Sequence, residues 1–186
     1  NQTDAVLVVQ DGTVVAERYR PDFGGRDTAH RSWSMAKSVV QALAGILVRD
    51  GRLDVYDPAP VPQWSDPDDP RHAITTDQLL RMASGLAWNE DYFAEDSDTT
   101  AMLWGEGSDD MAAYTASKPL EEPPGTRVAY ATGTSNIVAG IVGGIVGTGD
   151  AYEAFIDDEL LDPIGIDVDR TNIGWDGAGQ IVGGSQ

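Results

Sequence analysis

Cysteine is absent from this chain of 186 residues, and lysine is nearly absent. Without cysteine the chain has no thiol nucleophile, no disulfide and no cysteine-ligated zinc site. Lysine and arginine together number 12, and only Lys37 and Lys118 are lysines. A lysine that such a composition retains is a candidate for a specific chemical role.

Histidine is also scarce, with His30 and His72 as the two examples. Neither lies in a local pattern typical of a metal ligand or a catalytic triad, so we expect no metal and no cofactor. A Ser-His-Asp triad stays open as an alternative, because its members need only be close in space. The Gly-x-Ser-x-Gly pattern of a nucleophile elbow does not occur.

Glycines recur between residues 140 and 149, but they match neither the dinucleotide-binding pattern nor the phosphate-binding P-loop. We interpret residues 137–146 as a helix of small residues that packs closely on its neighbours. This segment is too short to span a bilayer, which takes about 20 apolar residues. We therefore expect no membrane partner.

Acidic residues dominate the charge: 31 aspartates and glutamates give a formal net charge of -19 and a pI near 4.1. The chain is still 41% hydrophobic, enough to form a core. The acids are scattered singly and in pairs, which keeps a folded surface soluble at high salt. With the scarcity of lysine, this indicates adaptation to strong brine in an extreme halophile. Divalent-cation binding is the rival explanation, but no clustered ligand spacing supports it.

The same charge argues against nucleic acid as a partner, because a surface so negative repels phosphate groups. No signal peptide is visible in the sequence. On that ground we expect a cytoplasmic location in a high-salt environment.

Ser34 and Lys37 stand three residues apart at the start of an apolar segment that runs to Gly51. On a helix this spacing places both side chains on one face, with about 5–6 Å between their Cβ atoms. A neutral Lys37 amine could then take the Ser34 hydroxyl proton and activate the nucleophile. Ser32 or Ser34 occupies an N-cap position, where free N–H groups and the helix dipole favour a developing anion. The apolar segment itself predicts a helix buried in the centre of a domain.

Several stretches resemble, in the same order, segments of the serine β-lactamase and penicillin-binding-protein superfamily, whose nucleophile motif is Ser-x-x-Lys. Residues 33–38 carry that motif, and residues 74–86 resemble a threonine-capped short helix that ends in Ser-Gly-Leu. Residues 124–136 resemble the second motif, in which a tyrosine faces the serine and lysine. Residues 88–92 favour the branch that resembles 6-aminohexanoate-dimer hydrolases and β-lactamase-like esterases over true β-lactamases.

The resemblance assigns roles to individual residues. Ser34 matches the nucleophile, Lys37 its proton partner and Tyr130 the second acid or base. A lysine ammonium beside Tyr130 would favour its phenolate, which could pass a proton to a leaving amine or alcohol. Thr132 matches a position at which the family often has asparagine or serine, and is a candidate for substrate contact.

Tyr92 follows an acidic pair, as does a loop tyrosine that can touch substrate in the resembling hydrolases. A loop tyrosine packed on the edge of the domain is the alternative interpretation. Asp98 is interpreted as a helix cap or a solvated charge, outside the site.

Local patterns predict the other elements. Residues 5–10 and 14–19 predict two strands of a hairpin. Residues 54–71, which include five prolines, predict a long irregular connection. Helices with recognisable caps or stops are predicted at residues 76–84, 108–117, 134–146 and 151–161.

These features predict one α+β domain over residues 1–186, mainly helical, with a sheet begun by the hairpin. The resemblance implies a β-lactamase/transpeptidase-like fold, with an antiparallel sheet completed by C-terminal strands that carry a third motif, often Lys-Thr-Gly. No such motif occurs here. We therefore expect a segment of a longer enzyme, with the C-terminal part of that enzyme as its partner.

Two function classes stay open. The first is a serine hydrolase that forms an acyl-Ser34 intermediate with a small-molecule ester, amide or lactam. The second is a noncatalytic relative that keeps the pocket for binding or for a structural purpose.

Overall fold

A computed structural model describes residues 3–167 and 171–184 of the chain. The chain divides into two compact units, Asn1–Arg31 and Ser32–Gln186. All candidate site residues belong to the second unit. A single domain over residues 1–186 stays a prediction.

The first unit contains an antiparallel hairpin of β1 (Ala5–Gln10) and β2 (Thr13–Tyr19), which confirms the two predicted strands. Asp11 and Gly12 form the turn with φ values of 50° and 75°. Two positive φ values are what a type I′ hairpin turn requires. In the described part of the chain the sheet consists of these two strands, so each of them has one unpaired edge.

The Ser-x-x-Lys motif lies where a 3-10 turn, Trp33–Met35, leads into helix α1, Ala36–Arg49. Ser34 is therefore in the 3-10 turn and Lys37 is in the first turn of α1. The α-helix begins at Ala36, one residue later than an N-cap at Ser34 would place it. Ser32 holds the N-cap position of the 3-10 turn but makes no side-chain capping hydrogen bond. The motif still lies at a helix N-terminus, as the sequence predicts.

Helix α1 buries one face rather than its whole circumference, which corrects the expectation of a helix buried all round. Its buried side chains recur at spacings of one, three and four residues: Ala36, Val40, Leu43, Ala44 and Leu47. Val48 is 41% exposed, as expected for the outer face of a helix that lies on one side of a core. The helix stops before Gly51, whose φ is 68°, a conformation typical of a helix C-terminus.

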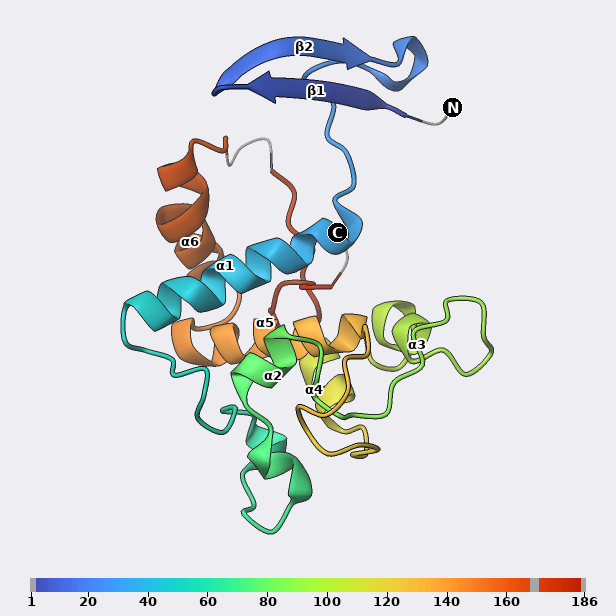
Figure 1. Cartoon of the computed structure of the whole chain (residues 1–186), viewed down its shortest axis with the longest axis vertical. Coiled ribbons are helices and arrows are strands. Elements are labelled where there is room, and N and C mark those ends of the chain that lie inside the picture. Colours follow the sequence, from blue (N-terminus) through green and yellow to red (C-terminus); the bar gives the residue numbers. More distant parts are fainter. Residues whose placement is uncertain (1–2, 168–170, 185–186) are drawn as a thin grey trace. The chain divides into compact units, whose positions relative to one another are not determined.

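Helix α5 (Thr132–Val146) is central to the second unit, and most of its residues are buried. It contacts α1 on one side and α2 (Thr76–Leu80) and α4 (Met111–Ala116) on the other (Figure 1). Small residues permit this close packing: a Cβ on Gly133 would lie 2.5 Å from Cη2 of Trp88. The predicted small-residue helix is confirmed, and it begins at residue 132 rather than 134.

The remaining elements are short. Helix α2 begins with a capping box in which Thr75 and Gln78 bond reciprocally, as the threonine cap predicted. Helix α3 (Asp98–Trp104), whose N-cap is Ser97, was not predicted from the sequence. The other segments are helix α6 (Asp150–Ile156), a wide helical turn at Asp157–Leu161, and 3-10 turns at Pro21–Phe23, Pro62–Trp64, Pro70–Ala73 and Asp162–Ile164.

A glycine pair near the end of the described chain lies against α1 and α5. A Cβ on Gly183 would lie 2.8 Å from Cγ2 of Val40 and 3.0 Å from Cβ of Ala139, and one on Gly184 would overlap Cγ2 of Thr132. Only backbone without a side chain fits so close to both helices. Because Gly184 packs this closely on Thr132, its carbonyl group lies near the start of α5.

Candidate active site

Ser34, Lys37 and Tyr130 meet in the structure, although Ser34 and Tyr130 are 96 residues apart in sequence. Lys37 Nζ lies 3.1 Å from Ser34 Oγ, and the Tyr130 hydroxyl lies 2.8 Å from the same oxygen. Lys37 Nζ is also 5.1 Å from the centroid of the Tyr130 ring. Tyr130 is 53% exposed, so a serine hydroxyl with two proton-handling neighbours stands at an accessible surface.

Lys37 Nζ donates to three oxygen atoms. They are Ser34 Oγ at 3.1 Å, Thr132 Oγ1 at 3.3 Å and the Gly184 carbonyl oxygen at 2.5 Å. An ammonium has three N–H donors and no acceptor. The arrangement therefore fits a protonated Lys37 with each hydrogen directed at one acceptor.

Thr132, the first residue of α5, is fully buried. Its hydroxyl donates to Glu90 Oε1 and accepts from Lys37 Nζ. The hydrogen bonds of this hydroxyl are thus with Lys37 and Glu90. Substrate contact by Thr132 stays a prediction.

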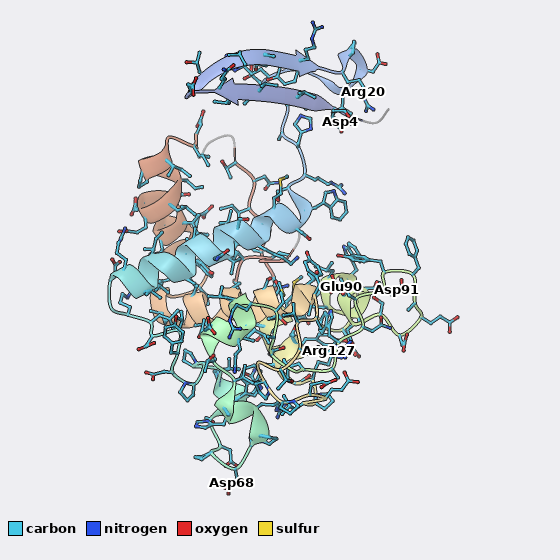
Figure 2. The ribbon with its side chains drawn as sticks, viewed as in Figure 1. Asp4, Arg20, Asp68, Glu90, Asp91 and Arg127 are labelled. Atoms are coloured by element: carbon cyan, nitrogen blue, oxygen red, sulfur yellow. The ribbon has the colours of Figure 1, made fainter. Side chains whose placement is uncertain are left out.

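Glu90 is a partly buried carboxylate in the loop beside α3 (Figure 2). Its Oε2 accepts from Trp88 Nε1 at 2.7 Å, Thr99 Oγ1 at 2.9 Å and the backbone N–H of Thr132 at 2.8 Å. Its Oε1 accepts from the Thr132 hydroxyl. Four donors on two oxygens match an ionised carboxylate, which only accepts hydrogen bonds.

Tyr92 lies near the same network and is 38% exposed. Burial raises the pKa of its phenol, and the charge of Glu90 adds to the rise. The ring packs on Trp104 with 6.5 Å between centroids. The Tyr92 side chain thus packs on a neighbouring ring and is also partly exposed, so both interpretations made from the sequence stay open. Contact of Tyr92 with substrate stays a prediction.

His72 and Asp98 form hydrogen bonds or ion pairs with other parts of the fold rather than with Ser34 or Lys37. His72 Nδ1 lies 2.8 Å from the Trp64 carbonyl oxygen, so this ring nitrogen is engaged there. Asp98 accepts from the Asn89 N–H at 2.7 Å and pairs with Lys118 Nζ at 2.5 Å. Interpreting Asp98 as a cap or a solvated charge was therefore wrong: it joins the loop that carries Glu90 to the segment after α4.

Sequence reasoning missed Glu90 and Gly184. Glu90 lies in the stretch that carried part of the resemblance, but its contact with Thr132 spans 42 residues and has no local signal. The contact of Gly184 with Lys37 spans 147 residues. Consecutive glycines can mark a place where backbone approaches closely, and Gly183 with Gly184 is the signal that could have been used.

Metal clusters and membrane-spanning helices are both absent from residues 3–167 and 171–184. No three histidine, aspartate or glutamate side chains there are grouped to hold a metal ion. No helix there is long and apolar enough to cross a membrane.

The geometry defines a class of protein: a serine followed by a lysine on the next helical turn, faced by a tyrosine that precedes a buried helix. A sequence profile of the Beta-lactamase family matches residues 2–182. The chain belongs to this family. Its fold is the β-lactamase/transpeptidase-like α+β fold, as the sequence predicts.

Individual relatives agree with this assignment. Protein Rv1367c of Mycobacterium tuberculosis is 31% identical over 159 residues, which cover 76% of this chain and 38% of that protein. The 6-aminohexanoate-dimer hydrolase of Paenarthrobacter ureafaciens is 34% identical over 92 residues, which cover 48% of this chain and 23% of that protein. A solved penicillin binding protein from Bacillus halodurans matches with a TM-score of 0.67 at 16% identity, over 92% of this chain and 53% of that one. The chain thus spans about half or less of the length of these relatives.

Proposed function

We propose that the protein to which this chain belongs is a serine hydrolase that forms an acyl-Ser34 intermediate. The observation that carries the proposal is the position of Ser34 Oγ, 3.1 Å from Lys37 Nζ and 2.8 Å from the Tyr130 hydroxyl. A serine hydroxyl is a weak nucleophile until a neighbouring group accepts its proton. Both neighbours are within hydrogen-bond reach of that proton.

Because Lys37 Nζ lies among three acceptors, we assign it the role of a positively charged ammonium and assign Tyr130 the role of the base. An ammonium at Lys37 stabilises negative charge on the Tyr130 oxygen, and the phenolate then takes the Ser34 proton. Ser34 Oγ forms a bond to the carbonyl carbon of the substrate. As the bond to the leaving group breaks, Tyr130 returns the proton to the leaving nitrogen or oxygen, and water later releases the acyl group. A neutral Lys37 that takes the proton directly is the alternative route.

The substrate we propose is a small amide, ester or lactam. The likeness to a 6-aminohexanoate-dimer hydrolase favours an amide. The partial exposure of Tyr130 supports a substrate that reaches the serine from solvent.

A substrate panel tests this function on the full protein in molar salt. The panel holds p-nitrophenyl esters, nitrocefin and short amide oligomers, each assayed against wild type and Ser34→Ala. We expect turnover of at least one class by the wild type and none above background by the variant. Wild-type rates in Ser34→Ala would refute the serine mechanism, and no turnover of any class would favour the noncatalytic alternative.

A further inference from the structure

The first turn of α5 lacks a side-chain cap of its own. Ala131 is the N-cap residue and makes no side-chain hydrogen bond to the helix. The first N–H groups of a helix have no partner within it and favour a negative group. Glu90 supplies that group from a loop 42 residues earlier, through the bond from the Thr132 N–H to Oε2 at 2.8 Å.

The same carboxylate sets the direction of the next hydrogen bond. The Thr132 hydroxyl has one hydrogen, which it donates to Glu90 Oε1. Its lone pairs are thereby left to accept from Lys37 Nζ at 3.3 Å. A hydroxyl that pointed its hydrogen at Lys37 could not serve as an acceptor for the ammonium.

We propose that Glu90 is a positioning residue of the active site, which fixes Thr132 as a hydrogen-bond acceptor and thereby holds the Lys37 ammonium against Ser34. This role rests on the proposed function, because it assigns Glu90 a part in preparing the Ser34 nucleophile. The hydrogen bonds of the Glu90 carboxylate go to Trp88, Thr99 and Thr132 rather than to Ser34. It acts through Thr132, with Trp88 Nε1 and Thr99 Oγ1 holding the carboxylate in place.

Glu90→Gln is the decisive substitution, since it keeps the size of the side chain. The amide brings two N–H donors to a place where four donors already converge, so the bonds to Thr132 cannot all form. Glu95→Gln is the matched control, because Glu95 is exposed in the same loop and its replacement removes the same charge. Thr132→Val removes the hydroxyl that the proposal places between Glu90 and Lys37.

Lysine side-chain NMR tests the positioning without any need for turnover. Residues 1–186 contribute two lysine Cε signals, assigned by their loss in Lys37→Arg and Lys118→Arg. We expect Glu90→Gln and Thr132→Val to shift the Lys37 signal while Lys118 stays in place, and Glu95→Gln to move neither. An unchanged Lys37 signal in Glu90→Gln would overturn the proposal. So would equal movement of Lys118, which pairs with Asp98 at the base of the same loop and therefore reports general disorder.

Labelling of Ser34 by a fluorophosphonate gives the second readout. We expect the labelling rate to fall on the order of 10- to 100-fold in Glu90→Gln, the cost of a misplaced catalytic group. The double variant Glu90→Gln/Thr132→Val should be no slower than the worse single variant, because both act through one contact. Additive losses would show that Glu90 acts by another route. If wild type itself is not labelled, the proposed function fails, while the NMR result still decides the role of Glu90.

Discussion

Ser34 Oγ receives hydrogen bonds from two side chains that differ in kind. Lys37 supplies a compact positive charge from one helical turn away, and Tyr130 supplies a phenol that can both give and take a proton. The lysine is itself held by a backbone carbonyl and a buried hydroxyl. The proposed nucleophile therefore lies among groups that are themselves held by hydrogen bonds in the free protein.

Lys37→Ala and Tyr130→Phe test these two neighbours. Each should lower kcat/KM by on the order of 10²-fold or more, the usual contribution of one acid or base. Melting temperatures should change little, because Lys37 is only partly buried and Tyr130 is exposed. Tyr56→Phe is the control, since Tyr56 is 76% exposed and lies outside the site. Unchanged kcat/KM in Tyr130→Phe would remove the tyrosine from the mechanism.

The sequence was sufficient to nominate Ser34, Lys37 and Tyr130, because a motif of fixed spacing and a family order of motifs point to them. It was not sufficient for Glu90 and Gly184. Their roles arise from contacts across 42 and 147 residues, which depend on how α1, α5 and the intervening loops pack. No property of the isolated segments specifies that packing.

Among the elements, α5 brings the site residues together, because three other segments of the chain contact its first turn. Glu90 caps it, Lys37 from α1 reaches Thr132, and Gly184 packs on its side.

The hairpin and α5 were predicted because their turn residues and small-residue run are strong local signals. Helix α3 was missed, although Ser97 at its N-cap and Asp98 in its first turn are local signals that could have been used. The limited burial of α1 is set by its neighbours.

Two glycine substitutions test the close packing at α5. Gly184→Ala should lower the free energy of unfolding by about 1–3 kcal/mol, the usual cost of overpacking, because its Cβ would overlap Thr132 and lie 2.8 Å from Asn136 Nδ2. Gly144→Ala should raise it by up to about 1 kcal/mol, since alanine favours helix and the added Cβ would meet no atom within 4 Å beyond the adjacent backbone of its own helix. Urea denaturation of both variants measures the difference. Equal stability of the two would contradict the placement of Gly184.

For the whole molecule, the dominant physical feature is a formal charge of -19. The Debye length is about 30 Å at 0.01 M salt and about 3 Å at 1 M, so repulsion acts across the whole fold only at low salt. We propose that this charge reflects adaptation to brine and that the melting temperature rises steeply into molar KCl or NaCl. Thermal melts in both salts measure this. A melting temperature that stays flat from 0.1 to 3 M would count against the adaptation.

Residues 1–186 expressed alone should be inactive and prone to association. The matched region covers 38% of protein Rv1367c. In the part of the chain that the structure describes, the hairpin has unpaired strand edges, a known route to aggregation. The resemblance also places one donor of the oxyanion hole on a later strand, and loss of one such donor costs about 10²–10³ in rate. We expect activity to return when the remaining part of the enzyme is supplied. A soluble monomer of residues 1–186 with an ordinary enzymatic rate would contradict this.

The most direct test of the acyl-Ser34 mechanism is the mass of the full protein after reaction with a fluorophosphonate. We predict one covalent adduct, located on Ser34 by peptide mapping, at a rate that drops when Lys37 or Tyr130 is replaced and to zero in Ser34→Ala. An adduct on another residue, or no adduct on a folded wild-type protein, would contradict the central claim that Ser34 is an activated nucleophile.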